Sequence, residues 1–448
     1  MKKFIESISN VWKIEELKNR ILITLGLLLV YRFGAHVTLP GIDATQLTGL
    51  AGQTKNGLGS ILDMFTGGAF SKASVFALGI MPYISASIVV QLMGIAIPYL
   101  QKLQSDGESG RKKINQITRW LTIVITLVQG PTYIYNLYRT LPSSAFLLGF
   151  NSFEFLFSSV VILVTGTIFA MWLGEKITDK GIGNGISLLI MVGILARLPQ
   201  AFMQEFTTRV TNNNGGPMLL VIEIIIWLLV IISCVLLVMA IRKIPVQYAR
   251  RTTSGDFEQD MMGGNRQWIP LKLNASGVMP IIFAQAIMFI PAAVAGLSKS
   301  DASQSIVGAF SNMFGFWYNF VFATLIVVFT FFYTAITVPT NKMSDDLKRS
   351  GGFIPGVRPG AETSDYLDKV MSLITFPGSL FLALIAVFPA IVVSLMDVQQ
   401  SWAMFFGGTS LIIMVGVAID TIQQINSYLL NKHYDGLMKT GKNRKAVA

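Results

Sequence analysis

Long uninterrupted runs of apolar residues alternate with polar connections along most of the chain. Ten of these runs approach or exceed the roughly 20 residues that an α-helix needs to cross a bilayer. They lie at 21–38, 75–97, 120–138, 153–173, 184–204, 218–241, 277–297, 317–339, 370–395 and 403–430. The run at 184–204 is the weakest, because Arg197 and Pro199 interrupt it. This pattern predicts an all-α, polytopic membrane protein with ten transmembrane helices.

Two short phrases recur within these runs, each time five runs apart. Gly79-Ile-Met-Pro-Tyr-Ile84 returns as Gly277-Val-Met-Pro-Ile-Ile282, and Gly185-Ile-Ser-Leu-Leu-Ile190 returns as Gly408-Thr-Ser-Leu-Ile-Ile413. Because five is odd, a five-helix unit used twice enters the membrane in opposite orientations, and such inverted repeats place a substrate pathway between the halves. The predicted divisions are an N-terminal half at 1–205, a C-terminal half at 206–431 and a basic tail at 432–448.

Composition and charge agree with a membrane location. The chain is 52% hydrophobic and 13% charged, whereas soluble domains are about 25% charged. Most of the 35 Lys and Arg residues fall in the N-terminal arm, in every second connection and in the tail. This positive-inside pattern predicts that both termini are cytoplasmic. The first run follows Glu15 and Glu16 and has no small-residue cleavage site close behind it, so we expect a retained anchor helix.

The residues that enzymes and ion-coupled pumps need are missing from the apolar runs. Their ionisable residues all lie toward run ends: Arg32, Glu154, Arg197, Glu223 and Asp420. His36, His433 and the single Cys234 stand far apart, which excludes an internal disulfide and a metal-ligand cluster. The stretch 436–442 resembles the start of a Walker A motif, but Asn443 replaces the required Ser or Thr and no strand precedes it. We therefore expect no catalytic residue, no metal and no cofactor.

Isoleucines occupy matched positions of the repeated phrases: Ile80, Ile84, Ile186, Ile190, Ile282 and Ile413. The first two are one helical turn apart, as are the next two, so each pair shares a helix face. Six aliphatic side chains at matched depth predict a constriction that closes by dewetting or around a passing chain. Plain helix packing is the alternative for any one of them. Pro82 and Pro280 remove a helix hydrogen bond near the middle of their runs, which predicts bending there.

A short apolar segment at 57–68 separates the first and second runs. It contains a helix candidate, Ile61 to Phe65, with glycines on both sides. The segment is too short to span a membrane and too apolar for an ordinary external loop. It either lies at the membrane interface as an amphipathic segment or folds back into the bundle as a stopper.

Two cytoplasmic connections, 242–276 and 340–369, are longer than the topology requires, and both are basic and rich in turn-forming residues. Basic loops often only set topology and contact lipid headgroups. Here, however, Gly and Pro residues that hold fixed turns surround Arg358. A rigidly held arginine is typical of a site that binds a protein partner or the phosphates of ribosomal RNA. Its planar guanidinium can form two parallel hydrogen bonds to such a group. Docking is therefore favoured over a role in topology alone.

Four motifs taken together resemble the SecY family, the central subunit of the bacterial protein-conducting channel. They are Ala77-Leu-Gly-Ile-Met-Pro-Tyr-Ile-Ser-Ala-Ser87, Gly181-Ile-Gly-Asn-Gly-Ile-Ser187, Pro270-Leu-Lys-Leu-Asn274 leading into Gly277-Val-Met-Pro280, and Ile354-Pro-Gly-Val-Arg-Pro-Gly360. The similarity runs from about residue 10 to 430. It implies two inverted five-helix halves around a central hourglass pore.

The resemblance also implies roles for particular residues. The six isoleucines correspond to the pore ring, and the segment 57–68 resembles the plug of the closed pore, with Ile61, Leu62, Met64 and Phe65 as its apolar residues. The second and seventh spans would line a lateral gate, at which we place Pro82, Gln91, Pro280 and Gln285. Partner docking would involve Arg250, Arg251 and Arg358. The loop 249–268 departs from the family pattern, with Asp256, Glu258, Asp260, Met261 and Met262.

The resemblance implies that the chain passes unfolded secretory polypeptides across the bacterial plasma (inner) membrane and releases apolar segments sideways into lipid. Energy would come from a partner. The implied partners are the small membrane subunits SecE and SecG, the motor ATPase SecA, the ribosome, signal sequences with their unfolded preproteins, and membrane lipid. Two alternatives stay open: a solute transporter of inverted-repeat design, and a scaffold or insertase-type module without a through-pore.

Overall fold

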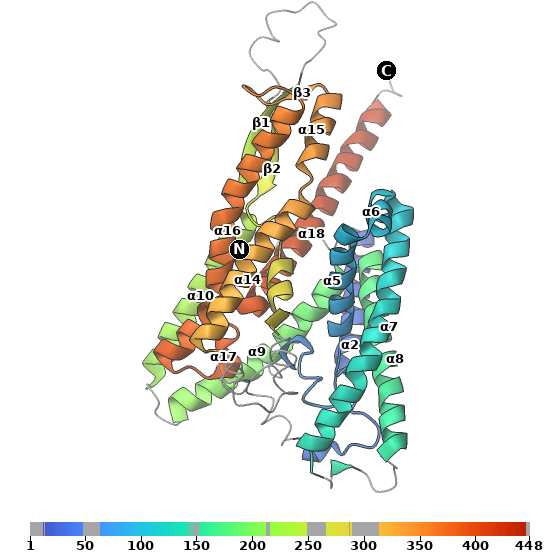
Figure 1. Cartoon of the computed structure of the whole chain (residues 1–448), viewed down its shortest axis with the longest axis vertical. Helices are drawn as coiled ribbons and strands as arrows, with labels where there is room; N and C mark the ends of the chain where they lie inside the picture. The colour runs from blue at the N-terminus through green and yellow to red at the C-terminus, as the bar shows by residue number, and fades with distance from the viewer. Residues whose placement is uncertain are drawn as a thin grey trace, which may run out of the picture. The chain divides into compact units, whose positions relative to one another are not determined.

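The computed structural model describes residues 14–47, 63–142, 145–146, 152–211, 216–248, 266–285, 287–288 and 313–444, together with Trp12 (Figure 1). Its helices are α2 (Glu15–Gly34), the 3-10 helix η1 (Ala44–Gln46), α5 (Met81–Ala96), α6 (Pro98–Ser105), α7 (Gly107–Thr140), α8 (Ser152–Lys180), α9 (Gly185–Thr211), α10 (Gly216–Met239), α14 (Phe316–Thr337), α15 (Thr340–Arg349), α16 (Ala361–Met396), α17 (Gln400–Ala403) and α18 (Gly408–Arg444). The strands are β1 (Ile241–Tyr248), β2 (Arg266–Lys272) and β3 (Gly352–Phe353).

Six of the described helices are long and apolar enough to cross a membrane, beginning with α8, α9 and α10 and continuing with α14, α16 and α18. The pair α5 and α6 would make a seventh span if it is taken as one, although it bends by 104°. The predicted spans at 21–38 and 120–138 fall largely in α2 and α7, which also carry charged residues. The last part of the predicted span 277–297, residues 289–297, lies outside the described residues. The helical membrane fold is confirmed, and the count of ten spans stays a prediction.

The chain packs as two compact units. The first unit comprises Met1–Pro217, Gln399–Trp402 and Val417–Ala448, and the second comprises Met218–Val398 and Ala403–Gly416. In the first unit, α7 packs against α5, α6 and α8, while α8 also contacts α2 and α9. Its core includes Phe70, Tyr133 and Leu163, and the Tyr133 hydroxyl donates to the Phe70 carbonyl at 2.8 Å. Burial of these large side chains stabilises the unit through the hydrophobic effect.

Both repeated Met-Pro phrases begin a helix. Gly79 and Gly277 have φ angles of +53° and +63°, values in the left-handed region that glycine adopts most readily. Pro82 lies in the first turn of α5, and Pro280 is the second residue of the helical stretch 279–285. The prediction that these prolines bend their helices near the middle was wrong. A proline in the first helical turn costs no helix bond, because its N–H would have no intrahelical partner anyway.

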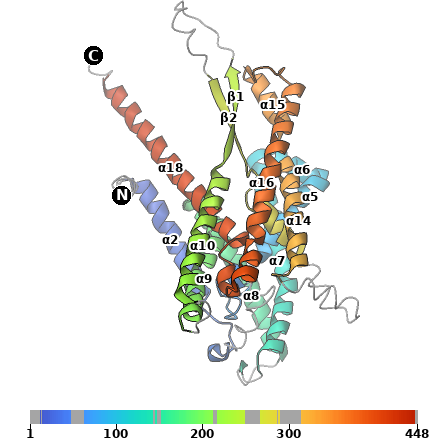
Figure 2. The same ribbon diagram turned by 90° about the vertical axis from the view of Figure 1, so that its left-hand side faces the viewer.

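In the second unit, the two long connections fold together. Strands β1 and β2 pair as an antiparallel ribbon, which Figure 2 shows, and β3 pairs with the other edge of β1 in the order β2-β1-β3. Ile244 and Val246, two positions apart, are buried on one face of β1. They belong to a small hydrophobic core. Its other buried residues are Leu271 of β2, Leu347 of α15, Ile354 just after β3, and Leu367 and Met371 of α16. A core of its own gives this region a defined shape.

A buried ion pair on α9 ties down the short stretch before α17. Glu205 and Arg209 are only 1% and 3% exposed, and the Arg209 Nε lies 2.8 Å from Glu205 Oε1. The backbone N–H of Gln399 donates to Glu205 Oε2 at 3.0 Å. The Trp402 ring packs against Phe202 with ring centroids 5.4 Å apart. The carboxylate of Glu205 therefore connects α9 to a stretch almost 200 residues away.

Replacing Glu205 by alanine is expected to destabilise the first unit by about 3 kcal/mol, because it removes the carboxylate of a buried ion pair and the acceptor of the Gln399 N–H. The thermal unfolding midpoint of the detergent-solubilised protein would measure the loss. Glu108→Ala is the matched control, since Glu108 pairs with Lys112 in an exposed i, i+4 bridge of a kind that contributes little. Equal unfolding midpoints for the two variants would contradict the proposal that the Glu205 carboxylate stabilises the contact between α9 and the stretch at Gln399.

Candidate functional site

One face of α9 carries a stripe of residues with a common spacing. Ile186, Ile190, Gly193 and Arg197 follow at intervals of four, three and four residues, which places them on one side of a helix. Ile190 is buried, while Ile186 and Arg197 are partly buried. The two predicted ring isoleucines of this helix therefore share a face with a glycine and an arginine.

The 63–71 segment of the chain packs on that face. A Cβ atom at Gly193 would lie 2.6 Å from the Phe65 carbonyl oxygen, so only glycine lets the segment approach this closely. A Cβ at Gly79, just before Ile80, would lie 3.1 Å from Thr66 Cγ2. Every residue from Asp63 to Ser71 is buried. The segment thus contacts both elements of the first unit that carry ring isoleucines.

Charged side chains hold this segment in place. Asp63 forms an ion pair with Arg197, and its Oδ1 accepts the backbone N–H of Ser71 at 2.8 Å. The Arg197 guanidinium also donates to Ser71 Oγ at 2.9 Å. From α2, the Arg32 guanidinium donates to the Gly67 carbonyl at 3.2 Å. Two arginines from two helices therefore clamp one short segment, and charge-assisted bonds of this type are the strong ones.

Lys72 stands at the end of the clamped segment. Burial, and secondly the positive charge of Arg32, lower the pKa of Lys72. Both causes disfavour the ammonium form. Arg32 and Lys72 therefore repel each other, whereas Arg197 is paired with the carboxylate of Asp63.

The sequence interpretation missed this clamp. It placed all ionisable residues of the apolar runs toward run ends, but Arg197 lies midway along α9. The signal was present as two opposite charges in apolar settings: Asp63 in the short segment and Arg197 in the weakest run. Of the two locations left open for 57–68, the buried position of 63–68 agrees with a segment folded back into the bundle. Ile61 and Leu62 lie outside the described residues.

The remaining predicted ring and gate residues are distributed over both units. Ile80 precedes α5 and is buried, and Ile84 is partly buried one turn later. Gln91 donates to Ser87 Oγ on the same helix at 3.3 Å. In the second unit, Gln285 and Ile413 are buried and Ile282 is partly buried. Since four ring positions belong to the first unit and two to the second, a ring that joins all six stays a prediction.

Arg358 is presented by a fixed turn in the second unit. Its side chain is 87% exposed and lies 3.7 Å from Glu362. Its carbonyl accepts the Thr363 hydroxyl at 2.8 Å, and the Ser344 hydroxyl donates to the Gly360 carbonyl at 2.6 Å. Such bonds hold the backbone of the turn, while the guanidinium in its exposed bridge to Glu362 stays accessible to a partner. Arg250 and Arg251 lie outside the described residues.

The glycine-rich stretch 181–185 is a turn that starts a helix. The Asn184 side chain accepts the backbone N–H groups of Ile186 and Ser187 at 3.2 and 3.3 Å, which is an N-cap at the start of α9. The Ile182 N–H donates to Thr24 Oγ1 at 3.1 Å, and the Gly183 N–H donates to Gln424 Oε1 at 2.8 Å. The turn is thereby joined to α2 and α18.

Comparison with known proteins identifies relatives along nearly the whole chain. The model of the SecY family matches residues 74–422. The chain is 41% identical over 427 residues to the protein translocase subunit SecY of Haemophilus influenzae, covering 95% of this chain and 94% of that protein. It is 38% identical over 449 residues to the same subunit of Thermotoga maritima, covering 98% and 99%.

Solved structures share the fold at low sequence identity. One is described as a protein-conducting channel, with a TM-score of 0.58, 16% identity and 92% of each chain covered. A second concerns a SecY protein whose plug domain stabilises the closed state and maintains a membrane seal, with a TM-score of 0.59, 16% identity and 92% of each chain covered. A third is the idle yeast Ssh1 complex bound to the 80S ribosome, with a TM-score of 0.54, 14% identity and coverage of 91% and 89%.

Proposed function

The chain belongs to the SecY family, and from this premise we propose that it conducts unfolded polypeptides through a pore closed by a plug. It is a channel subunit of a protein translocase and not an enzyme. The observation that carries the proposed plug is the clamped 63–71 segment, which packs on the face of α9 that bears Ile186 and Ile190. In this proposal the residues 57–68 close the pore at rest.

The proposed constriction is the six-isoleucine ring. Aliphatic side chains offer a passing chain no hydrogen bonds, so they do not retain its polar backbone, and an apolar constriction excludes water and ions by dewetting. Because Gly193 and Arg197 follow Ile190 on the same face of α9, the plug would lie directly beyond the ring. A translocating polypeptide would displace the plug and take its place.

The proposed lateral gate uses the helices that begin with the two Met-Pro phrases. Gly79 and Gly277 precede these helices with positive φ angles, and glycine absorbs backbone rotation at low cost. Each helix would tilt about its glycine, so that apolar segments leave sideways into lipid. Pro82, Gln91, Pro280 and Gln285 would line the opening.

The proposed energy source is a partner, because the sequence holds no complete nucleotide-binding motif. Arg358 on its fixed turn, with Arg250 and Arg251, would dock the SecA motor or the ribosome. The small subunits SecE and SecG would complete the complex. The excess of Lys and Arg in alternate connections supports cytoplasmic termini. The plasma (inner) membrane location is proposed from membership of the family.

Disulfide capture of a stalled secretory chain tests the pore. With Cys234 replaced by serine, a cysteine at Ile84 or Ile190 is expected to crosslink to a cysteine in the stalled chain, because the ring surrounds it. The crosslink should require both a signal sequence and the motor. A cysteine at Leu229, whose side chain is 61% exposed on α10, is the control and should stay unlinked.

If the stalled chain is caught at cytoplasmic loop cysteines but at neither ring position, the protein docks polypeptides without conducting them. That result would favour the scaffold or insertase-type alternative.

A further inference from the structure

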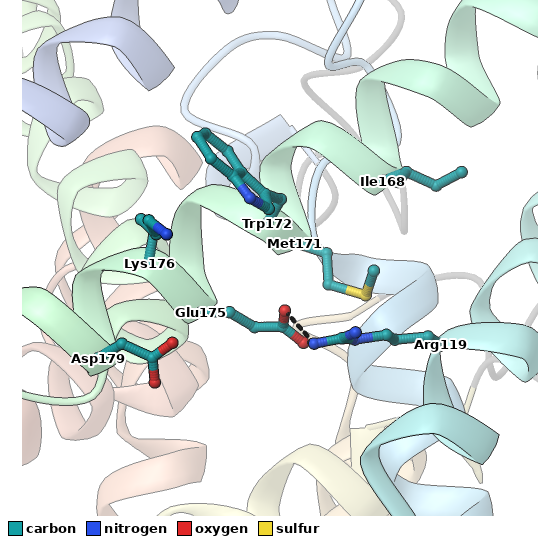
Figure 3. Close-up of a pocket in the computed structure, with 7 residues that line it drawn as sticks. All are labelled: Arg119, Ile168, Met171, Trp172, Glu175, Lys176 and Asp179. Carbon is teal, nitrogen blue, oxygen red and sulfur yellow. Dashed lines mark hydrogen bonds and ion pairs between the residues drawn. The ribbon is translucent and has the colours of Figure 1, made fainter. Parts of the chain in front are cut away.

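A cavity of about 410 Å³ opens between α7 and α8 in the first unit. Figure 3 shows the residues that line it: Ile168, Met171, Trp172, Glu175, Lys176 and Asp179 from α8, and Arg119 from α7. Its volume is in the range of ligand pockets in proteins. From this cavity we infer that the protein binds a zwitterionic phospholipid with a primary ammonium headgroup, of the phosphatidylethanolamine class.

The lining residues change from apolar to ionic along α8. Ile168, Met171 and Trp172 come first, and the ionic residues follow one and two turns later, at spacings that keep them on one helix face. Trp172 is 46% exposed, and tryptophan concentrates at the headgroup level of bilayers. With the proposed cytoplasmic orientation of this helix end, the apolar residues meet an acyl chain and the ionic residues meet its headgroup.

Two of the four charges neutralise each other. Arg119 Nε donates to Glu175 Oε1 at 2.9 Å and Arg119 Nη2 to Glu175 Oε2 at 2.6 Å, and Figure 3 shows this pairing by a dashed line. Such a bidentate pair satisfies both groups. Because the pair has no net charge, the headgroup preference depends on the other two ionic residues.

Lys176 and Asp179 supply one positive and one negative charge. The Lys176 Nζ lies 5.8 Å from the Trp172 ring centroid, and within the described part of the chain neither residue has a salt-bridge partner. Three positions along the helix separate them, so they lie on neighbouring turns. A lipid phosphate at Lys176 and a primary ammonium at Asp179 satisfy both charges together.

This arrangement discriminates among headgroups. A phosphatidylglycerol headgroup leaves the Asp179 carboxylate beside hydroxyls and without a cation. A phosphatidylcholine headgroup brings a cation, but its quaternary ammonium has no N–H to donate. Only the primary ammonium forms a charge-assisted hydrogen bond to the carboxylate. The expected preference is therefore ethanolamine over choline and glycerol headgroups.

Native mass spectrometry of the purified full chain, in micelles with equimolar phosphatidylethanolamine, phosphatidylcholine and phosphatidylglycerol, tests the inference. The wild type should retain phosphatidylethanolamine preferentially. Asp179→Asn should weaken that retention about tenfold, as expected for the loss of one charge-assisted bond, without weakening phosphatidylglycerol. Lys176→Gln should weaken retention of all three lipids, because each carries a phosphate. Asp345→Asn, an exposed carboxylate on α15, is the matched control and should change nothing.

Retention of the three lipids in equal amounts, or preferential retention of phosphatidylglycerol, would overturn the site. So would an Asp179→Asn variant with the selectivity of the wild type. Free phosphoethanolamine tests the source of the ligand: it should fail to displace the lipid at equal concentration, and displacement would overturn the phospholipid assignment. None of these readouts involves polypeptide transport, so their failure is distinct from failure of the proposed channel.

Discussion

The Asp63→Asn variant will leak ions at rest. The ion pair with Arg197 is mostly buried, since the Asp63 and Arg197 side chains are 12% and 24% exposed. Asparagine keeps an oxygen for the Ser71 N–H but leaves Arg197 without its carboxylate and near a second cation, Arg32. We expect the state in which the 63–71 segment packs on α9 to be destabilised by about 2 kcal/mol, less than for a fully buried pair because of the partial exposure. The population of channels in which the segment is displaced from α9 then rises about 30-fold.

Conductance of the purified channel in planar bilayers measures this effect without a substrate. Open events should become far more frequent in Asp63→Asn than in the wild type. Arg197→Gln should leak as well, and the double variant should leak no more than the worse single one, because residues of one pair are not additive. Resting conductance equal to the wild type in both single variants would show that the clamp does not keep the pore closed.

The second large effect concerns docking. Arg358→Glu should slow motor-driven export about 30-fold or more, the loss typical of an interface hot spot, while the protein still inserts and folds. Stability should be nearly unchanged, because the Arg358–Glu362 bridge is exposed and such bridges contribute little. The measurement is the initial rate of ATP-driven preprotein import into vesicles that contain the translocase.

Two variants sharpen the docking test. Arg358→Lys keeps the charge but loses the planar fork, so it should recover export only in part. Arg349→Glu, at the exposed end of α15, reverses a nearby charge away from the fixed turn and should export normally. Export by Arg358→Glu at the wild-type rate would remove this residue from the docking role.

The family and the helical membrane fold were both predicted from the sequence, and both are confirmed. Apolar length is a local property, so helices such as α10 and α16 could be recognised from consecutive residues alone. The motif around Gly79 and the motif around Arg358 are also short and contiguous. Each can be recognised without reference to the rest of the chain.

Proline position was harder to interpret. The apolar run at 75–97 suggested a helix with Pro82 near its middle, whereas α5 begins at Met81. The residues before Met81 form turns instead. They pack against the clamped segment and make backbone hydrogen bonds outside a helix, such as that from the Val75 N–H to the Val37 carbonyl at 2.9 Å. Apolar character signals burial, and it does not distinguish helix from irregular structure where neighbours supply the backbone hydrogen bonds.

What the sequence alone determined about this protein is therefore its family, its membrane class and the exposed position of Arg358 in a turn. Only the tertiary structure decided that Arg197 holds Asp63, that the connections 242–276 and 340–369 share one sheet and core, and that Arg119 and Glu175 neutralise each other beside Lys176 and Asp179. The physical reason is that charge pairing, strand pairing and close packing act between residues far apart in the chain, and those distances are set by the fold.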